Sequence, residues 1–494
     1  MCPRHILFCR LLTSFDRYGK LGQAFLKKQH KEEIYRMSNH KKPEIQENKM
    51  GVLPVNKLLL SMAIPMMISM MVQALYNVVD SIFVARISEN ALNAVSLAFP
   101  IQNLMIAVAT GTGVGINALL SRSLGQKRFD RANATAVNGV FLGVCSYIVF
   151  AVFCALFSRP FFALQTDVTE IIEGGTQYLM ICGVLSVGLF MEITFSRLLQ
   201  ATGQTMYSMI VQLIGAGINI IFDPIFIFVF DMGIAGAAVA TVLGQIISSG
   251  FSIYFNLKYN KELTLQFKGF RPSRQIIGSI YSVGIPSIVM ASIGSVMTFC
   301  MNQILIAFTT TATAVLGVYF KLQSFIFMPI FGLNNGMVPV VAYNFGARKP
   351  DRMMKTVKLS ILYASAIMFL GMAAFQLIPH VLLGFFEPSP KMLEIGVTAL
   401  RVISLHFALA GFCIISSSMF QAMGHGTFGL IISLVRQLVV LLPAAWLLSL
   451  TGRLELIWWA FPIAEIASLV MCLVFHRVVY HRDILPMNSH AGDQ

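Results

Sequence analysis

The sequence predicts an all-α integral membrane protein with about twelve transmembrane helices in two six-helix repeats, and three observations support this. Of its 494 residues, 56% are hydrophobic and 12% are charged, about half the charged share of an ordinary soluble domain. A membrane-spanning helix needs about 20 apolar residues, so this composition provides for twelve of them. The apolar residues lie in long stretches between short polar breaks, and the chain resembles itself at one fixed offset.

The apolar stretches give the expected positions of the helices. The first six helices are expected near residues 58–85, 92–118, 132–157, 175–200, 207–230 and 234–257. The second six are expected near residues 279–307, 313–342, 356–379, 398–421, 428–449 and 456–477. The domains expected from these groups are an N-lobe at 58–257, a cytoplasmic linker at 258–278, a C-lobe at 279–477, and tails at 1–57 and 478–494.

The polar breaks indicate the orientation of the helices. Lys and Arg gather in the breaks after the second, sixth and eighth helices, whereas Asp and Glu dominate the odd-numbered breaks. Short cytoplasmic loops are rich in Lys and Arg. We therefore expect a multi-pass protein of the cell inner (plasma) membrane with both termini in the cytoplasm.

The N-terminal tail is basic, and about half of the net charge of +14 falls within residues 1–57. This tail has no helix-turn-helix pattern, no Cys/His framework and no aromatic stacking platform, so nucleic acid is not an expected partner. It also has no apolar core of a signal peptide. Met37 and Met50 lie much nearer the first helix than Met1 does, and a start at either would make part of the tail an artefact.

A shift of the chain by 221 residues aligns its two halves without a gap. The shift places Ile64 and Pro65 on Ile285 and Pro286, and it aligns further polar, glycine and charged positions. These further pairs are Gln102 with Gln323, Gly125 with Gly346, Asp130 with Asp351, Gln200 with Gln421, and Gly203 with Gly424. Because each half has an even number of helices, both halves share one orientation and enclose a cavity between them, an arrangement that suits alternating access.

The first half carries the acidic residues most unusual for a membrane interior. Asp80 follows Gln73 and Asn77 at helical spacing, so these three polar groups share one helix face. Asp223 follows Asn219 by one turn in the fifth helix. Both helices run outward and both acids lie in the outer half, which places them at one depth. Since a mid-membrane acid is costly, the pair predicts a proton or cation site, with buried structural carboxyl groups as the alternative.

The second half replaces these acids with other residues. Met301 stands at the position equivalent to Asp80, and Ala444 stands at the position equivalent to Asp223. Three charged residues appear instead where the first half has Pro or Gly, namely Lys321, Arg436 and Glu465. A structural ionic network in the C-lobe is the favoured interpretation of these three, and His406 is expected to be a satisfied core histidine.

The sequence contains no pattern for ATP-driven pumping or for enzyme chemistry. It has no GxxxxGK[ST] phosphate loop, no CxxC pair and no nucleophile beside a base. We therefore expect no enzyme, no metal site and no cofactor apart from H⁺ or Na⁺ as coupling ion. Thr241 in the sixth helix adds a hydroxyl that can serve a site or bond back to its own helix.

Several of these segments together resemble the multidrug and toxic compound extrusion (MATE) family of secondary transporters. The resemblance covers roughly residues 52–480. The similar segments are Leu75–Val84, Leu199–Gly203, Asn219–Pro224, Gly236–Thr241, Gln323–Pro329 and Tyr343–Gly346. The resemblance implies a twelve-helix export fold whose two lobes rock around a central cavity and expel drugs in exchange for protons or sodium ions.

Within that family, the chain is similar to the bacterial DinF-like branch. Asp80, Asn219, Asp223 and Thr241 fall on positions that this branch uses for its N-lobe cation site. The NorM-like branch places a carboxylate in the seventh helix, but this chain has none between Arg274 and Lys321. The resemblance thus implies coupling in the N-lobe alone.

The expected function is secondary active efflux of amphipathic, often cationic, small molecules by antiport with H⁺ or Na⁺. The expected partners are small-molecule drugs or metabolites and membrane lipid, with the chain acting as a monomer. One alternative is a lipid-linked oligosaccharide flippase of the same superfamily, which would need a cavity lined with Arg and Lys to hold pyrophosphate. A second alternative is a non-transport membrane enzyme or receptor scaffold, which would need a cluster that only folding reveals.

Overall fold

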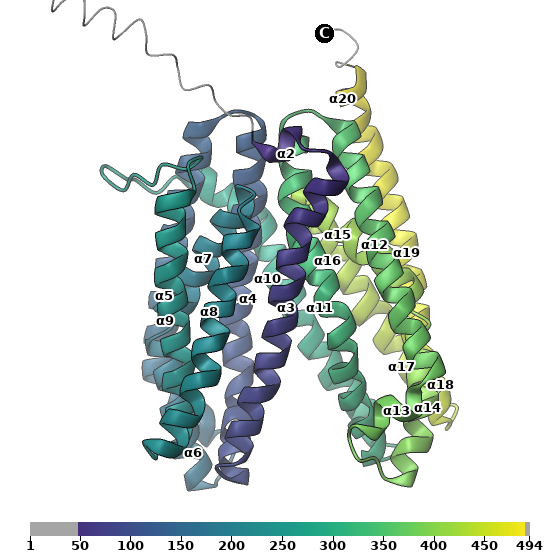
Figure 1. Ribbon diagram of the computed structural model, residues 1–494. Helices are drawn as coiled ribbons and strands as arrows, with labels where there is room; N and C mark the ends of the chain where they lie inside the picture. The colour runs from purple at the N-terminus through teal and green to yellow at the C-terminus, as the bar shows by residue number, and fades with distance from the viewer. Residues whose placement is uncertain (1–47, 490–494) are drawn as a thin grey trace, which may run out of the picture. The chain divides into compact units, whose positions relative to one another are not determined.

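The computed structural model describes residues 48–489, which form helices and connecting loops (Figure 1). Its first group of helices, which we call the N-lobe, follows the short helix α2 (Lys49–Val52). The N-lobe consists of α3 (Val55–Ala85), α4 (Glu89–Gly125), α5 (Phe129–Ala163), α6 (Thr169–Val184), α7 (Val187–Ala201), α8 (Thr205–Pro224), the π-helix η1 (Ile225–Val229) and α9 (Gly233–Tyr259).

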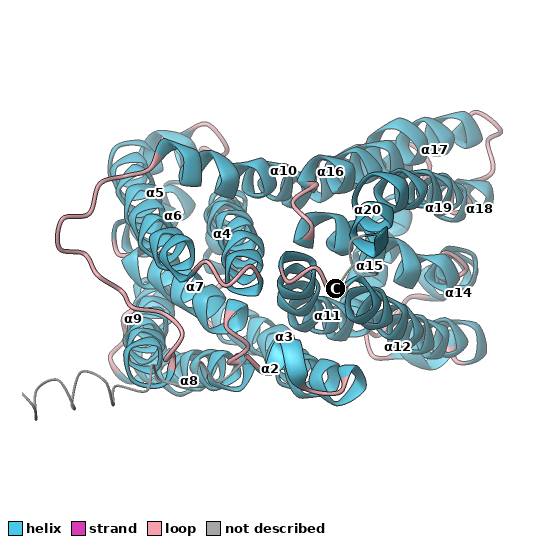
Figure 2. Ribbon diagram, turned by 90° about the horizontal axis from the view of Figure 1, so that it is seen from above, coloured by secondary structure: helices cyan, strands magenta, loops and turns pink. Residues whose placement is uncertain are grey.

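The second group of helices, which we call the C-lobe, follows the loop after α9. It begins with α10 (Arg274–Ile306), α11 (Thr310–Gly346), α12 (Pro350–Leu377), α13 (Pro379–Gly384), α14 (Pro390–Ser404) and α15 (Phe407–Ala422). It ends with α16 (Gly426–Leu434), the π-helix η2 (Val435–Leu441), α17 (Leu442–Ser449), α18 (Leu454–Ile457), α19 (Ala460–Val479), the π-helix η3 (Tyr480–Ile484) and α20 (Leu485–Ser489). Figure 2 shows the two groups side by side.

The described residues contain ten helices long and apolar enough to cross a membrane, or up to twelve when two bent pairs each count as one span. The first pair, α6 and α7, bends by 43°, and the second pair, α14 and α15, bends by 50°. The sequence predicts each pair as one helix, near residues 175–200 and 398–421. The predicted all-α membrane fold is therefore confirmed, and the two breaks are features that the apolar pattern did not indicate.

The helix bounds repeat at the offset found in the sequence. Helices α4 and α11 begin and end 221 residues apart, and the bent pairs begin at Thr169 and Pro390 with the same separation. The tight corners repeat as well. Lys127 and Arg348 have positive φ angles of 57° and 54°, and Gly203 and Gly424 have 86° and 95°. A corner that needs the left-handed region costs most residues free energy, so its recurrence at equivalent positions indicates a shared backbone path.

Two of the long helices begin with a side chain that caps a free backbone amide of the first turn. Ser88 accepts a hydrogen bond from the backbone amide of Ala91 at 3.0 Å and so caps the start of α4. Thr309 caps the start of α11 in the same way, through the amide of Thr311 at 3.3 Å. These caps explain why both helices begin several residues before their apolar cores, which start near residues 92 and 313.

One end of the molecule carries many basic side chains, and we call it the basic end. These side chains lie on the loops near residues 126–128, 260–273 and 347–349. The ribbons of the two lobes converge there and diverge toward the opposite, far end, where α6 and α14 begin (Figure 1). Each lobe has its own cluster of buried apolar side chains, and a few residues of each cluster come from the other lobe.

Glycines let the two lobes touch backbone to backbone. A Cβ at Gly115 in α4 would overlap the Ile280 carbonyl of α10, and a Cβ at Gly336 in α11 would lie 2.7 Å from the Cα of Ala63 in α3. Gly111 and Gly332 make the same pair of approaches one turn away, to Ile288 and Met67. Because Gly115 and Gly111 are equivalent to Gly336 and Gly332 in the repeat, the lobes meet through two copies of one contact.

Helix α2 lies at the basic end and bonds to the C-lobe, although it precedes the N-lobe in the chain. The Asn344 side chain donates to the Met50 carbonyl at 3.1 Å, and the Arg352 guanidinium donates to the carbonyls of Met50 and Leu53 at 3.2 and 2.7 Å. Burial lowers the pKa of Lys49, and the nearby Glu262 carboxylate opposes that change.

The observed helices extend beyond the predicted ones at both ends of the membrane domain. The predicted tail runs to residue 57, but α3 begins at Val55; the predicted C-terminal tail begins at 478, but helical structure continues to Ser489. The sequence pattern reports the apolar core of a span, whereas helical hydrogen bonds continue into the polar margin. The tail at 1–47 lies outside the described residues.

Candidate functional site

Two polar side chains of α8 lie buried just before a change in helix type. Asn219 is 3% exposed and Asp223 is 0% exposed, and they are one helical turn apart. The next residue, Pro224, has no backbone amide to donate, and the chain continues as the π-helix η1. Single π-helical turns within longer helices are frequent at functional sites. This irregular turn lies directly beside the two buried side chains.

Asn219 connects α8 to α9. Its side-chain amide donates to Thr241 Oγ1 at 3.1 Å and approaches Asp223 Oδ1 at 3.4 Å. Helix α9 comes this close because glycines line its contact with α8: a Cβ at Gly244 would lie 2.8 Å from the Gly215 carbonyl. The structure therefore brings Asn219, Asp223 and Thr241 into one cluster.

Two oxygen atoms of this cluster have no hydrogen-bond partner among the described residues. They are Oδ1 of Asn219 and Oδ2 of Asp223. A buried oxygen without a donor costs free energy, and buried polar groups are usually satisfied by protein, water or an ion. The pair of free oxygens therefore suits a proton or a small cation.

Asp80 in α3 brings a second carboxyl group to the same place. Asp80 is half-buried, and its carboxyl group is a close neighbour of that of Asp223. Two adjacent carboxylates in an apolar lobe repel each other unless a proton or a cation lies between them.

The other predicted residues of α3 contribute differently. Gln73 and Asn77 share the helix face of Asp80, but their side chains are exposed in the structure. They therefore line the open side of the helix, whereas Asp223 and Asn219 provide the buried part of the site.

Two residues near Asp80 were not predicted from the sequence. Tyr178 in α6 is 4% exposed and is an electrostatic neighbour of Asp80, and its hydroxyl accepts a hydrogen bond from Gln102 of α4 at 3.2 Å. A tyrosine in an apolar stretch gives little sequence signal by itself. The sequence signal for this part of the site was the alignment of Gln102 with Gln323 in the repeat.

The C-lobe contains a separate network of charged and polar side chains. Glu465 is 2% exposed, and one of its oxygens lies 3.6 Å from both the Arg436 guanidinium and the His406 ring. The other ring nitrogen of His406 lies 3.0 Å from the Tyr319 hydroxyl. Arg436 and Glu465 thus form an ion pair, and His406 has partners on both sides. Lys321 is exposed and forms no ion pair with the residues of the described range.

A polar contact also crosses between the lobes near the basic end. The Arg197 guanidinium of α7 donates to Asn335 Oδ1 of α11 and to Gln200 Oε1, both at 3.0 Å. Glu192, five residues earlier, instead accepts a hydrogen bond from Ser196 at 2.9 Å. Of these two residues, only Arg197 forms a hydrogen bond across the interface between the lobes.

The chemistry of the N-lobe cluster is that of a site for a proton or a hard cation. Carboxylate, amide and hydroxyl oxygens are ligands for cations such as Na⁺, and a carboxyl pair can also hold a proton. Among the described residues there is no group of three or more His, Cys, Asp and Glu that could hold a transition metal. Nothing in the cluster resembles a nucleophile with its base.

Repeated membrane helices that bury acidic side chains between them are typical of membrane transporters. Within that class, the chain belongs to the MatE family, whose model matches residues 65–225 and 286–447. The two matched segments begin 221 residues apart, as the two halves of the sequence do.

Curated relatives and solved structures agree with this assignment. The multidrug export protein MepA of Staphylococcus aureus is 27% identical over 438 residues, which are 88% of this chain and 96% of MepA. The MepA of Staphylococcus haemolyticus is 27% identical over 85% of this chain and 93% of that protein. These relatives are exporters, so the protein is a transporter and not an enzyme.

Two solved structures have the same fold. One is described as the outward-facing conformation of a multidrug resistance MATE family transporter of the MOP superfamily, with 25% identity and a TM-score of 0.84 over 90% of this chain and 99% of that chain. The other is a MOP superfamily transporter from Pyrococcus furiosus, with 25% identity and a TM-score of 0.83 over 88% of this chain and 97% of that chain. The predicted MATE-like fold is confirmed.

Proposed function

We propose that this protein exports amphipathic, often cationic, small molecules by secondary active antiport with H⁺ or Na⁺. The observation that carries the proposal is the buried cluster of Asn219, Asp223 and Thr241 beside Asp80. The names of the curated relatives, which are multidrug export proteins, support the class of substrate.

The coupling site holds either a proton between the two carboxyl groups or a sodium ion among the four side chains. Binding of either one compensates the negative charge of Asp80 and Asp223, which is costly to bury between helices. Asn219 suits both forms, because its amide donates to Asp223 while its carbonyl oxygen is available to a cation. An ion shifts the equilibrium between two states only by its different affinity for each.

The arrangement of the lobes supports the proposal of alternating access. They contact each other near the basic end, through the paired glycines and the hydrogen bond of Arg197 to Asn335. With both termini in the cytoplasm, the basic end is the cytoplasmic end and this structure is the outward-facing state. The likeness to a solved outward-facing transporter supports that assignment. Ion binding from outside then favours release of the substrate, and ion release inside resets the transporter.

The site also fits a protein that acts alone in the plasma membrane. Each lobe has its own apolar core, and the proposed coupling residues all come from the N-lobe of one chain. No further cofactor is proposed beyond H⁺ or Na⁺, and the proposed partners are drugs or metabolites and the surrounding lipid.

The flippase alternative has weaker support from the cationic side chains. Arg436, one of its few candidates for holding a pyrophosphate, is paired with Glu465 at 3.6 Å. Its charge is therefore largely compensated within the lobe, and Lys321 remains as an exposed cation in α11. Since the curated relatives are named as multidrug export proteins, we propose drug export rather than transport of a pyrophosphate-linked lipid.

The test is dye efflux from proteoliposomes that contain the purified full chain. Proton and sodium gradients are imposed separately, and fluorescence reports the dye that leaves the vesicle. We expect efflux with one of these gradients and none when both are collapsed. Equal rates with and without any gradient would exclude antiport.

A further inference from the structure

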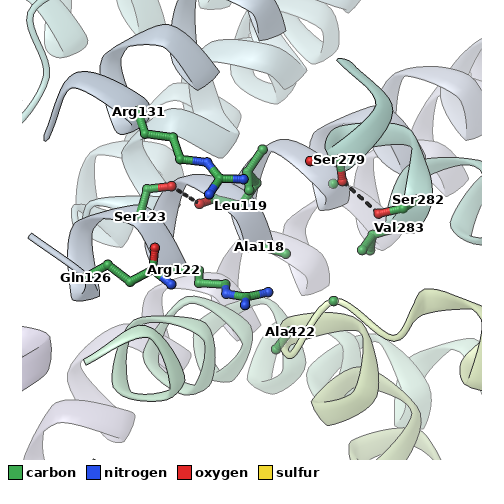
Figure 3. Close-up of a pocket in the computed structure, with 12 residues that line it drawn as sticks. Ala118, Leu119, Arg122, Ser123, Gln126, Arg131, Ser279, Ser282, Val283 and Ala422 are labelled. Carbon is green, nitrogen blue, oxygen red and sulfur yellow. Dashed lines mark hydrogen bonds between the residues drawn. The ribbon is translucent and has the colours of Figure 1, made fainter. Parts of the chain in front are cut away.

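A cavity of about 160 Å³ lies at the basic end between the two lobes (Figure 3). The N-lobe contributes residues of α4 and α5 to its wall, and the C-lobe contributes residues of α10 and of the turn between α15 and α16. The polar residues of the wall are Arg122, Ser123, Gln126, Arg131, Ser279 and Ser282. This volume is far larger than a single water molecule requires.

Two arginine side chains give this cavity an uncompensated positive charge. Arg122 and Arg131 both line it and lie close enough to repel each other. Neither guanidinium group forms an ion pair or hydrogen bond with any residue in the described range; Arg122 lies 5.0 Å from the centre of the Phe345 ring. A guanidinium has five N–H donors, so the pair leaves many donors without protein acceptors.

No acidic side chain of the wall compensates these charges. A carboxylate outside the wall, that of Asp483, acts on Arg122, but it is itself paired with His425 at 3.0 Å. The turn at Gly424, whose φ is +95°, lies beside the guanidinium: a Cβ there would lie 3.5 Å from Arg122 Nη1. The wall presents positive charge and hydrogen-bond donors. It therefore suits a ligand that has negative charge and hydrogen-bond acceptors.

We propose that this cavity binds a phosphate group, carried either by a soluble phosphate or by the headgroup of an anionic lipid. Paired arginines match phosphate in charge and in the planar geometry of their donors. The basic end also lies where the charged headgroups of a membrane would be found. Because both lobes form the wall, the bound anion stabilises the state in which the lobes meet at this end. That last consequence depends on the proposed alternating-access function; binding itself does not.

The first experiment measures binding to the full chain in detergent, with inorganic phosphate as the probe. We expect phosphate at ten times its Kd to raise the unfolding midpoint by about 2 °C over chloride at equal ionic strength. Arg122→Gln and Arg131→Gln should lose this rise. Arg128→Gln is the matched control, because Arg128 is exposed on the same connection and does not line the cavity.

The variants also report whether they fold. Removal of one of two repelling charges should leave the midpoint in chloride unchanged or higher, and Arg131→Lys should keep part of the phosphate response. An equal rise in chloride, or an equal phosphate response in wild type and both Gln variants, would overturn a site for soluble phosphate.

The second experiment distinguishes a lipid source. The chain is placed in phosphatidylcholine nanodiscs with or without phosphatidic acid. If the natural ligand is a headgroup, phosphatidic acid raises the midpoint of wild type and Arg128→Gln but not of Arg131→Gln. If neither probe gives a response that depends on Arg122 and Arg131, the phosphate site is disproved.

A third measurement addresses the stabilised state. Phosphate on the side of the basic end should slow dye efflux from proteoliposomes of wild type, and Arg131→Gln should resist this inhibition. Binding without inhibition would disprove the conformational consequence and leave the site itself standing. Absence of efflux in all variants would instead contradict the proposed export function, which the binding measurements do not involve.

Discussion

The two lobes use equivalent helix contacts for different purposes. In the N-lobe, α8 and α9 approach each other through Gly215 and Gly244, where a Cβ on Gly244 would lie 2.8 Å from the Gly215 carbonyl. In the C-lobe, the equivalent positions are Arg436 and Glu465, whose side chains form an ion pair at 3.6 Å. At this helix contact, backbone atoms meet in the N-lobe, whereas charged side chains meet in the C-lobe.

At the next two turns of the same helix, the polar side chains are in the N-lobe and the apolar side chains are in the C-lobe. The N-lobe has Asn219 and Asp223 one and two turns after Gly215, whereas the C-lobe has Val440 and Ala444 there. Each lobe therefore buries charge at one level of the same helix pair and is neutral at the other. The comparison indicates that the buried charge of the N-lobe is available for an ion, since it lacks the basic partner that neutralises Glu465.

The largest expected effect comes from removal of either N-lobe acid. Asp80→Asn and Asp223→Asn should insert and fold, because an amide fills the same volume without a charge, but both should lose gradient-driven dye efflux. The matched controls are Met301→Leu and Ala444→Ser at the equivalent C-lobe positions, and these should export nearly as wild type does. Wild-type efflux from both Asp variants would place the coupling site elsewhere, with Arg436 and Glu465 as the next candidates.

A second prediction concerns stability in the C-lobe. Glu465→Gln leaves the buried end of Arg436 without its anion, and removal of one partner of a buried ion pair typically costs about 3–5 kcal/mol. The unfolding midpoint should therefore fall, while efflux by the folded fraction remains coupled to the gradient. The double variant Arg436→Leu with Glu465→Leu should be more stable than Glu465→Gln alone. Loss of coupling in all folded C-lobe variants would contradict the division of roles between the lobes.

A third prediction tests the backbone contact of the N-lobe. Gly244→Ala introduces a methyl group 2.8 Å from the Gly215 carbonyl, and overpacking of this kind costs about 1–3 kcal/mol. Gly217→Ala is the control in the same helix pair, because a Cβ there meets nothing within 4 Å. It should raise stability by about 0.5–1 kcal/mol through helix propensity. Thermal unfolding measures both, and equal shifts would show that the close approach is unimportant.

The smallest effect on stability is expected from single cysteine substitutions, which test whether the two lobes have the same orientation in the membrane. Ser88 and Thr309 cap equivalent helices, so Ser88→Cys and Thr309→Cys should react with an impermeant thiol reagent from the same side, which we expect to be the outside. Ser273→Cys, at the basic end, should react from the other side. The cysteines should cost each helix at most about 1 kcal/mol of capping energy. Opposite labelling of Ser88 and Thr309 would rule out a parallel repeat.

Much of the fold was predictable because it depends on properties that one sequence displays. Apolar length gave the membrane helices, and the fixed offset gave the two halves. The breaks at Leu185–Ser186 and Leu405–His406 were not predictable, because these residues are no less suited to a helix than their neighbours and the bend follows from packing. The π-helical turn η1 was also missed, although Pro224 was a signal that the backbone bonding changes there.

The candidate site was predictable as far as the helices alone determine it. The spacing of Asn219 and Asp223 follows from one helix, and their resemblance to a known motif linked them to Asp80 and Thr241. Tyr178 and Gln102 come from two other helices, and only the packing of α4 and α6 brings them together. The pairing of His406 with Glu465 and Tyr319 joins the break between α14 and α15 to two other helices, which no spacing rule could identify.

The repeated glycine contact between the lobes has a consequence for conformational entropy. A surface of long side chains loses rotamer freedom each time it closes, whereas glycine has no side chain to immobilise. Gly111, Gly115, Gly332 and Gly336 therefore allow the lobes to meet closely with little entropic penalty from the contact residues themselves. In the proposed cycle, this interface can form and separate many times, with the glycines contributing specificity through the close fit of the two backbones.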